Sequence, residues 1–490
     1  MNGFSRCAIR SITLLIGAAW LSGCGMAYKQ SIVKIAQPYQ QGAYAIAAAN
    51  AVKAAQDTEK NNHHDRLALL LEEGTTLRTN TQLAQSTQAF DDADRMFEQF
   101  DQKAKVRLSR EAYAALVNQA ALDYEGYGYD RIMTNVYKAV NNLEAGRIDD
   151  ARIEIHRIAE SQVACEERYK DKIQHDEEEA QKLSKEKNVN VDMKRAQSDP
   201  KYQAGEKQVF ADFADVQNET PLDNLSHKRL YDNPFAEYLQ GLFYLYSGSG
   251  GDHEVGRVAL RNAAGMMQNN QFAVEDARLA DENSAGASPR TYIVFETGVS
   301  PSRSQIRIDI PVFLYNVAIH DTRVDYVGLA FPKLDKIDNQ TPFLNVGVGN
   351  TNYQTQLMAD MDKIVAREFK NDFPAILTRA IIGAVIKAGI NAGVAEATKN
   401  QDVWVQLIAR GGTVLYAAAT NEADVRTWRT LPKHIQIASF PTPADGAVRL
   451  SLPNGAPVAT VKVVAGKANM IWVRNSSVTA PCVVRAFLLN

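Results

Sequence analysis

Apolar residues in the first half of the chain recur with the spacing of an α-helix. In "GRIDDARIEIHRIA", Ala151, Ile155 and Ile158 lie three or four residues apart, which places them on one helical face. Similar spacings recur in "GAYAIAAANAVKAA", "FDDADRMFEQF" and "GRVALRNAA". A glycine before such a run is typical of the left-handed cap that ends a preceding helix. The pattern therefore predicts a series of helix–turn–helix units.

These units resemble the second helix of the tetratricopeptide repeat, in which a small residue lets a neighbouring helix approach closely. Successive small positions are Ala47, Ala93, Ala151 and Gly256, at separations of 46, 58 and 105 residues instead of the regular repeat of about 34. Residues 24–285 are therefore predicted to form a TPR-like helical repeat domain with insertions. The longest insertion, at about 166–207, is highly charged and predicts a projecting helix followed by a loop near 188–200. It is either a solvated face or an arm that reaches a partner.

Stacked helix pairs form a solenoid, and the concave face of a solenoid commonly binds a peptide or protein. The candidate interface residues on the predicted first helices are polar or aromatic: Asn135, Tyr137, Asn141, Tyr238 and Tyr244. The alternative is that they pack between repeats, which buried tyrosines commonly do.

The period changes to alternation after about residue 290. Short runs such as "RTYIVFETG", "QIRIDIPVFLY" and "ANMIWVR" are β-branched and bounded by Gly, Pro and Asn, which predicts strands. Residues 290–490 therefore predict a β-rich domain, and the whole chain an α+β fold. A helical insertion is expected at about 354–400. Its apolar stripe favours burial against the sheet over membrane insertion or oligomerisation, because Arg379 and Lys387 interrupt the apolar stretch.

The segment "ADVRTWRTLPKHIQIASF" combines residue types that dominate protein interfaces. Its candidate interface residues are Asp424, Arg426, Trp428 and Arg429. The alternative is that Trp428 fills the core while Asp424 and Arg426 form an ion pair at its rim.

The N-terminus has the pattern of a bacterial signal peptide. Two arginines precede a short apolar run, which ends in the tetrad "LSGC" at residues 21–24. This tetrad matches the bacterial lipobox, which implies cleavage after residue 23 and acylation of Cys24. Several acyl chains anchor a protein firmly to a membrane. Gly25 differs from the Asp of the enterobacterial inner-membrane retention signal, so the expected location is the outer membrane, facing the periplasm. An ordinary secretory peptide is the alternative.

Composition favours a water-soluble body on this anchor. The chain has 490 residues with 54 basic and 57 acidic side chains, a formal charge of −3. This balance argues against a nucleic-acid-binding protein, because such proteins carry a strong basic excess. Apart from Cys7 and Cys24, the cysteines are Cys165 and Cys482. In an oxidising periplasm these two either form a disulfide or remain free thiols.

Sequence motifs for catalysis are missing. The eight histidines form no H-E-x-x-H pattern, "SGSGGD" lacks the lysine of a phosphate-binding loop, and no G-x-S-x-G elbow occurs. No catalytic residue, cofactor or metal site is therefore predicted, and a non-enzymatic protein is expected.

The motifs "NPFAEYLQGLFY", "RIDIPVF", "AFPKL", "DFPAILTRAI" and "DVRTWRTLP" together resemble an uncharacterised family of bacterial outer-membrane-type lipoproteins with tetratricopeptide-like N-terminal repeats. Members are often encoded beside lipoproteins similar to the curli secretion channel and to an activator of penicillin-binding proteins. The resemblance implies other envelope lipoproteins or proteins as partners. The expected function is a lipid-anchored protein-interaction scaffold in a secretion or cell-wall complex. The alternatives are a regulator or enzyme of peptidoglycan metabolism, or a component of a pore-forming oligomer.

Overall fold

The computed structural model describes residues 23–61, 63–104, 122–186, 198–218, 232–248, 250–282, 288–316, 321–397 and 422–489. The predicted signal peptide lies outside this part, except for its last residue, Gly23. Helix α2 (Gly23–Gln40) carries Cys24 in its first turn. The loop predicted near 188–200 also lies largely outside the described residues.

The first half of the chain is helical, as the spacing predicts. Its helices are α2, α3 (Tyr44–Asn61), α4 (Arg66–Thr79), α5 (Leu83–Ala104), α7 (Gly128–Glu144), α8 (Ile148–Glu186), α10 (Pro200–Val209), α11 (Ala214–Gln217), α12 (Pro234–Ser247), α13 (Asp252–Met266) and α14 (Gln271–Glu282), with short 3₁₀ turns η1 (His63–Asp65) and η3 (Ala211–Phe213).

Consecutive helices pack against each other in pairs, among them α2 with α3, α4 with α5, α7 with α8 and α12 with α13. Gly42 and Gly146 have φ values of +78° and +71°, which is the left-handed conformation expected at the end of a helix. The small positions Ala47, Ala93 and Ala151 are fully buried, so the predicted apolar face is confirmed. The charged insertion is largely an extension of α8, which runs without interruption to Glu186.

The described residues of the second half form three sheets. The five-stranded sheet has the order β11-β10-β1-β7-β6, made by β1 (Arg290–Thr297), β6 (Gln356–Asp360), β7 (His434–Pro441), β10 (Asn469–Asn475) and β11 (Val483–Leu488). The four-stranded sheet has the order β5-β4-β8-β9, made by β4 (Asn345–Val348), β5 (Thr351–Gln354), β8 (Ala447–Ser451) and β9 (Pro457–Lys462). The third is a hairpin of β2 (Ser302–Asn316) and β3 (Asp321–Asp335). The chain is therefore an α+β protein.

The predicted helical insertion needs a correction at its start. Residues 356–360 form strand β6, which pairs with β7, and helix α15 (Met361–Ala397) begins only after it. β6 is a strand because it forms hydrogen bonds with β7. Since β7 lies far away in the sequence, the local spacing of residues does not reveal this pairing. Pro374 lies within α15 without ending it. The buried side chains of its first half include Val365, Phe369, Phe373 and Leu377, as expected for a helix packed against the body.

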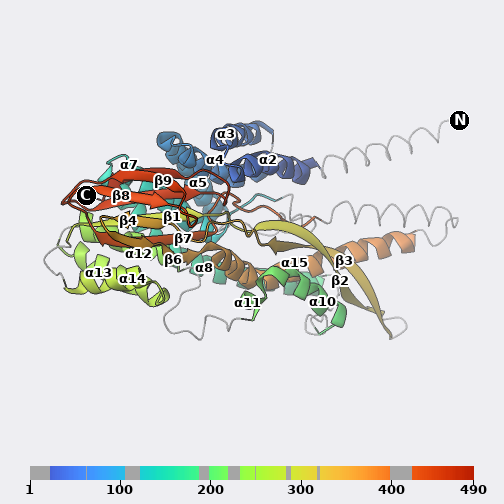
Figure 1. Ribbon diagram of the computed structural model, residues 1–490. Coiled ribbons are helices and arrows are strands. Elements are labelled where there is room, and N and C mark those ends of the chain that lie inside the picture. Colours follow the sequence, from blue (N-terminus) through green and yellow to red (C-terminus); the bar gives the residue numbers. More distant parts are fainter. Residues whose placement is uncertain are drawn as a thin grey trace.

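The five-stranded sheet is sandwiched between two apolar clusters because alternate residues of a strand face opposite sides. Along β1, Tyr292 and Val294 join the cluster formed with the helices, whereas Ile293 and Phe295 join the cluster shared with the four-stranded sheet. Helices, sheet and second sheet thus form three layers (Figure 1).

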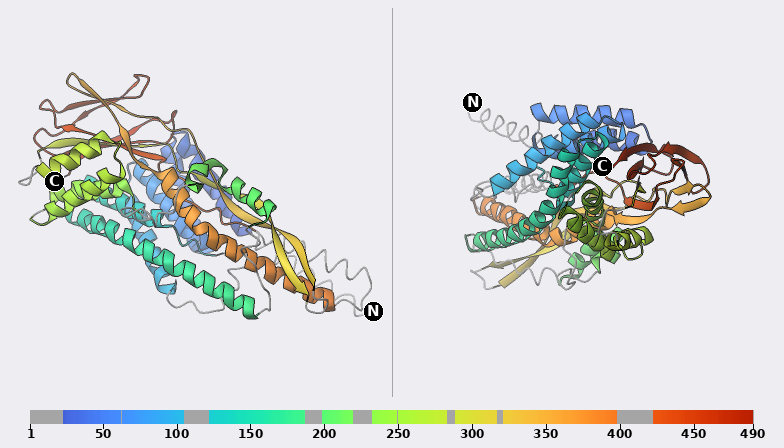
Figure 2. Two further views of the ribbon diagram at one scale, coloured as in Figure 1. Left: turned by 90° about the horizontal axis from the view of Figure 1, so that it is seen from below. Right: turned by 90° about the vertical axis from the view of Figure 1, so that its left-hand side faces the viewer.

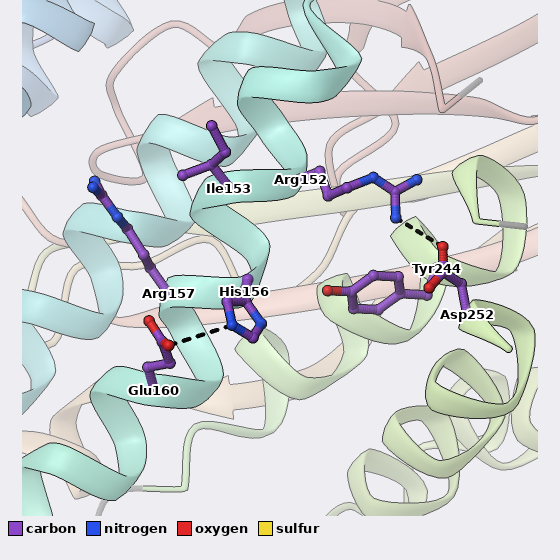
Figure 3. Close-up of a pocket in the computed structure, with 7 residues that line it drawn as sticks. All are labelled: Arg152, Ile153, His156, Arg157, Glu160, Tyr244 and Asp252. Carbon is purple, nitrogen blue, oxygen red and sulfur yellow. Dashed lines mark hydrogen bonds and ion pairs between the residues drawn. The ribbon is translucent and has the colours of Figure 1, made fainter.

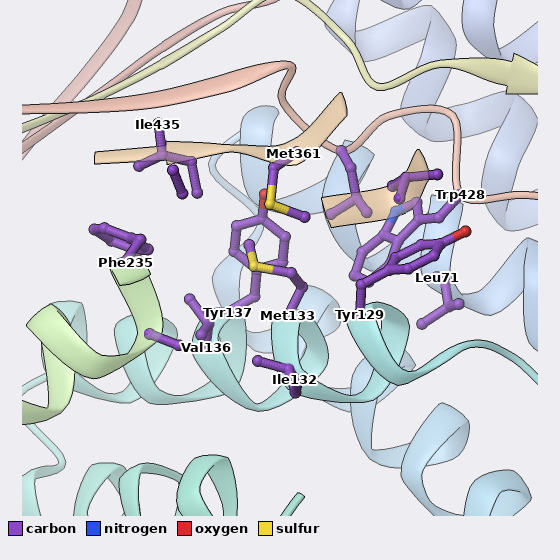
Figure 4. Close-up of a cluster of buried hydrophobic side chains, with 14 of the residues drawn as sticks. Leu71, Tyr129, Ile132, Met133, Val136, Tyr137, Phe235, Met361, Trp428 and Ile435 are labelled. Carbon is purple, nitrogen blue, oxygen red and sulfur yellow. The ribbon is translucent and has the colours of Figure 1, made fainter. Parts of the chain in front are cut away.

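One apolar cluster extends across both halves of the chain. It includes side chains from Tyr28 in α2 to Leu489 near the C-terminus. Figure 4 shows part of it, where residues of α4, α7, α12, α15 and β7 meet around Met133 and Trp428. The change from helix to strand occurs between Glu282 and Arg290, close to the predicted domain boundary, but the two halves share this core.

The β2–β3 hairpin and the end of α15 extend together beyond this body (Figures 1 and 2). The two strands pair over their full length, from Ser302 opposite Asp335 to Asn316 opposite Asp321. Within the described residues, none of the helices has both the length and the apolar composition needed to cross a bilayer.

Candidate functional site

Most of the candidate interface residues lie inside the protein. Asn135, Tyr137, Asn141, Tyr238, Arg426 and Trp428 are all at most 4 % exposed. The Tyr137 hydroxyl donates to Glu296 at 2.8 Å, and the Tyr238 hydroxyl donates to Asp276 at 2.6 Å. An interface role for these six residues is therefore corrected to internal packing, the alternative that the sequence left open.

Residues 422–433 join the helical and β-rich halves through hydrogen bonds. The Trp428 indole N–H donates to the Thr75 hydroxyl of α4 at 2.9 Å, and the Ser300 hydroxyl donates to the Trp428 carbonyl at 2.7 Å. Tyr28 of α2 donates to the Thr427 carbonyl at 3.1 Å. We call residues 422–433 the buried clasp, because they bind α2 and α4 to the end of β1 and the turn that follows it.

Arg426 is the main cation of the buried clasp. Its guanidinium forms two hydrogen bonds with the Asp424 carboxylate, at 2.8 and 2.9 Å, and a third with Asp65 at 3.2 Å. It also donates to the carbonyls of His64 and Leu122, at 3.0 and 2.8 Å. The predicted Asp424–Arg426 pair is therefore present, but the arginine is buried and not at a solvent-exposed rim.

Glu72 of α4 receives the backbone of the clasp. Its carboxylate accepts hydrogen bonds from the backbone N–H groups of Arg429 at 2.5 Å and Thr430 at 3.2 Å, and from the Thr430 hydroxyl at 2.6 Å. Burial disfavours the ionised form and raises the pKa of Glu72 to about 7, against the opposing effect of these hydrogen bonds. The arrangement binds chain segments together.

An open site lies between α8 and the junction of α12 with α13. It is a hollow of about 450 Å³ lined by Arg152, Ile153, His156, Arg157, Glu160, Tyr244 and Asp252 (Figure 3). We call these seven residues the α8 groove. Of the residues that the sequence singled out as interface candidates, only Tyr244 lines the groove, and it is 8 % exposed and belongs to the main apolar cluster.

Arg152 fixes the wall of the α8 groove. It forms an ion pair with Asp252 at 2.8 Å and donates to the Ser247 carbonyl at 2.7 Å. Its guanidinium carbon lies 5.3 and 5.9 Å from the ring centres of Phe243 and Tyr244, within the range of a cation–π contact. Helix α8 is thereby held against the end of α12.

The α8 groove has one exposed apolar side chain, that of Ile153, with charged side chains around it. Ile153 is 52 % exposed and lies off the apolar stripe of α8. His156 pairs with Glu160 at 3.3 Å, and Arg157 lies 3.4 Å from Glu154. An exposed isoleucine among charged and aromatic side chains is a combination suited to binding another protein. Sequence reasoning missed Ile153, although an apolar residue off the helical stripe is a signal that can be read.

Asp424 and Arg429 are partly exposed, and Asp424 already pairs with Arg426. The two cysteines remain separate free thiols, so the disulfide alternative is not observed. Cys165 lies in α8 in the main core, whereas Cys482 packs against the cluster between the two sheets. Burial raises the pKa of the Cys165 thiol to about 12 and that of Cys482 to about 11, so neither has the character of a reactive thiolate.

The described residues contain no group of His, Cys, Asp and Glu side chains arranged to hold a metal ion. They contain two polar clusters: the α8 groove, which is open to solvent, and the buried clasp, which is inside the protein. Comparison of the chain with protein-family models, curated proteins and solved structures found no match.

Proposed function

We propose that this protein is a lipid-anchored interaction protein of the outer membrane that holds another envelope protein at the α8 groove. The observation that carries the proposal is the exposed Ile153 beside Arg152 and Tyr244, in a hollow whose walls are fixed by ion pairs. The lipobox ending at Cys24 supports the anchor, and the pairing of successive helices supports a TPR-like scaffold. The resemblance to the lipoprotein family supports a partner in the same envelope.

A scaffold of this kind needs a rigid body and an accessible binding surface. The shared core and the buried clasp provide the rigidity, because they join α2 and α4 to the sheets. The α8 groove provides the surface. Arginine and aromatic residues contribute much of the binding energy at protein interfaces, especially where an apolar contact excludes water around them.

Photo-crosslinking in living cells tests the proposal. A benzoyl-phenylalanine placed at Ile153 is expected to yield a defined crosslinked product with another envelope protein. Val464 is the matched control, since it is 51 % exposed compared with 52 % for Ile153 but lies in the β-rich half. Equal products from both positions, or no product from Ile153 in any growth condition, would overturn the proposal.

A further inference from the structure

The residues that follow the predicted cleavage site carry positive charge and no negative charge. Between Cys24 and Gln56 the sequence has three lysines, Lys29, Lys34 and Lys53, and neither aspartate nor glutamate. The whole chain has 54 basic and 57 acidic side chains, so the charge of this stretch is opposite in sign to that of the protein. The stretch forms α2 and most of α3, which pack side by side along one margin of the body (Figures 1 and 2).

The three lysines lie on one surface of this helical pair. On α2 the exposed residues recur with helical spacing and are Lys29, Gln30, Val33, Lys34 and Gln37. On α3, as far as residue 56, they are Ala45, Ile46, Ala49, Lys53 and Gln56. The Asn50 side-chain amide of α3 donates to the Lys34 carbonyl of α2 at 2.8 Å, and this bond is exposed. The two exposed strips therefore adjoin, and we call these ten residues the α2–α3 face.

Large apolar side chains lie among the lysines of the α2–α3 face. Val33 and Ile46 are each 57 % exposed, the highest exposure of any large apolar side chain in the described part of the chain. No carboxylate of a described residue forms an ion pair with any of the three lysines. Free ammonium groups around exposed apolar side chains are typical of a surface that contacts anionic lipid, because the cations meet the phosphates while the apolar groups enter the boundary beneath them.

The position of the α2–α3 face in the chain favours lipid as what covers it. Lys29 and Lys34 follow Cys24 by five and ten residues within α2, which corresponds to about 8 and 15 Å along a helix. The attraction to a charged surface falls off within a Debye length of about 8 to 10 Å. If α2 stood upright on the leaflet, Lys34 would be largely screened. If α2 and α3 lie flat, all three lysines reach the headgroups.

The α2–α3 pair is firmly joined to the body, so the orientation of the pair determines that of the rest. Ile32 and Ile35 of α2 belong to the main apolar cluster. The Tyr28 hydroxyl donates to the Thr427 carbonyl in the buried clasp at 3.1 Å. A membrane contact at the α2–α3 face would therefore orient the whole protein, which a flexible acyl tether alone does not.

We propose that the α2–α3 face lies on the anionic phospholipid headgroups of the leaflet that holds the acyl anchor. The inference rests on the proposed function in one respect, because the choice of lipid over another protein depends on the anchor at Cys24. The acyl chains hold the protein at the membrane, and the lysines set the angle at which it stands there. The α8 groove is thereby presented to its partner in one orientation.

A tethered-vesicle experiment tests the inference. The chain 24–490 is coupled through Cys24 to a maleimide-bearing phospholipid, so that tethering does not depend on acylation in cells. Cys165 and Cys482 react slowly, because burial raises the pKa of both thiols. An environment-sensitive fluorescent amino acid replaces Ile46. Its emission is expected to shift to the blue on vesicles that contain phosphatidylglycerol at low salt, and not on phosphatidylcholine alone. The same probe at Val464, which is 51 % exposed in the β-rich half, is expected not to shift.

Removal of the lysine charges measures their contribution. The triple variant Lys29→Gln/Lys34→Gln/Lys53→Gln is expected to lower the ratio of docked to undocked protein by about tenfold or more, because each lysine close to an anionic surface strengthens binding severalfold. Lys34→Gln alone is expected to give a partial loss if α2 lies flat, whereas an upright α2 predicts no change. Raising the salt concentration should weaken the docking of the parent protein in the same direction.

The matched control carries the same change of charge elsewhere. Lys207→Gln, Lys462→Gln and Lys467→Gln combined, at exposed positions outside α2 and α3, should leave the blue shift unchanged. Urea unfolding of both triple variants verifies that they remain folded. A probe at Ile46 that stays in water on every vesicle would overturn the inference, as would a shift that survives loss of the three lysines or that a lipid-free dimer reproduces. Acylation of Cys24 in cells is measured separately, since its absence would refute the anchor of the proposed function without altering the tethered result.

Discussion

The buried clasp and the α8 groove are built from the same residue types but do opposite things. Each has an arginine near aromatic rings and an aspartate: Arg426 with Asp424 in the clasp, and Arg152 with Asp252 in the groove. The Arg426 side chain is 4 % exposed, whereas the Arg152 side chain is 36 % exposed. Composition alone therefore does not distinguish an internal joint from a binding surface. The distinction lies in how many of the polar groups are already satisfied and shielded from water.

The surroundings of the two arginines explain this difference. Arg426 donates to two carboxylates and two backbone carbonyls that come from separate parts of the chain. Removing it leaves several desolvated acceptors without a partner, which is costly. Arg152 has one carboxylate, one carbonyl and the faces of two rings, and the side chains of its ion pair with Asp252 are 36 % and 33 % exposed. Water can replace those contacts at low cost.

Trp428 gives the largest expected effect, because it is fully buried and bonded in the clasp. Trp428→Ala is expected to lower the free energy of unfolding by about 4 kcal/mol, the usual range for deleting a buried aromatic side chain. Trp428→Phe is the matched control, since it keeps an aromatic ring and loses the hydrogen bond to Thr75 and part of the indole volume. The phenylalanine variant is expected to lose about half as much free energy of unfolding as the alanine variant, or less. Urea unfolding of both variants checks this, and a loss below about 1 kcal/mol for the alanine variant would refute the role of the clasp.

Arg426→Met should have the next largest effect. The substitution keeps an unbranched apolar stem but leaves the Asp65 and Asp424 carboxylates without their cation, so a loss of about 3 kcal/mol is expected. The double substitution Arg426→Met with Asp65→Asn should lose less than the sum of the two single changes, because the uncompensated charge is removed. Strict additivity in the urea data would show that the two side chains are not coupled.

Glu72 predicts the pH dependence of the clasp. Its pKa is raised from 4.5 to about 7 in the folded chain, so the folded state holds this proton to higher pH than the unfolded state does. Stability is therefore lost as pH rises from about 4.5 to about 7 and changes no further from this group above that range. Glu72→Gln removes the titration and should flatten the curve by on the order of 3 kcal/mol, since one pKa unit is worth about 1.4 kcal/mol.

The measurement is the urea midpoint of both proteins at several pH values. Other buried carboxyls, such as Glu73 with a pKa raised to about 7 and Asp130 with a pKa raised to about 6, contribute a slope of the same sign. They are present in both proteins, so the comparison isolates Glu72. Identical slopes for the two proteins would contradict the prediction.

The same comparison explains which parts of the fold and of the candidate site could be predicted from the sequence. The helical stripe of Ala151, Ile155 and Ile158 and the alternation of β1 were predictable because each depends on local periodicity. The pairing of β6 with β7 was not, because its partner lies about 80 residues away. Nor was the burial of Arg426, whose acceptors other than Asp424 lie in two distant parts of the chain, at residues 64–65 and at Leu122. Ile153 was readable as an apolar residue off the stripe, but its significance depends on Tyr244 and Asp252, which only the fold brings beside it.

Arg152→Ala has the smallest expected effect on the free energy of unfolding. It best distinguishes the binding role of the α8 groove from the structural role of the buried clasp. It removes one ion pair, the hydrogen bond to the Ser247 carbonyl and two cation–π contacts at a partly exposed position, so a loss of about 1 kcal/mol is expected. Crosslinking from benzoyl-phenylalanine at Ile153 should nevertheless fall severalfold, because the wall of the groove is no longer fixed to α12. Arg278→Ala is the matched control, an exposed arginine on α14 that pairs with Glu275 and Glu282. If both arginine variants crosslink as well as the parent, then the fixed wall of the α8 groove has no part in holding the partner.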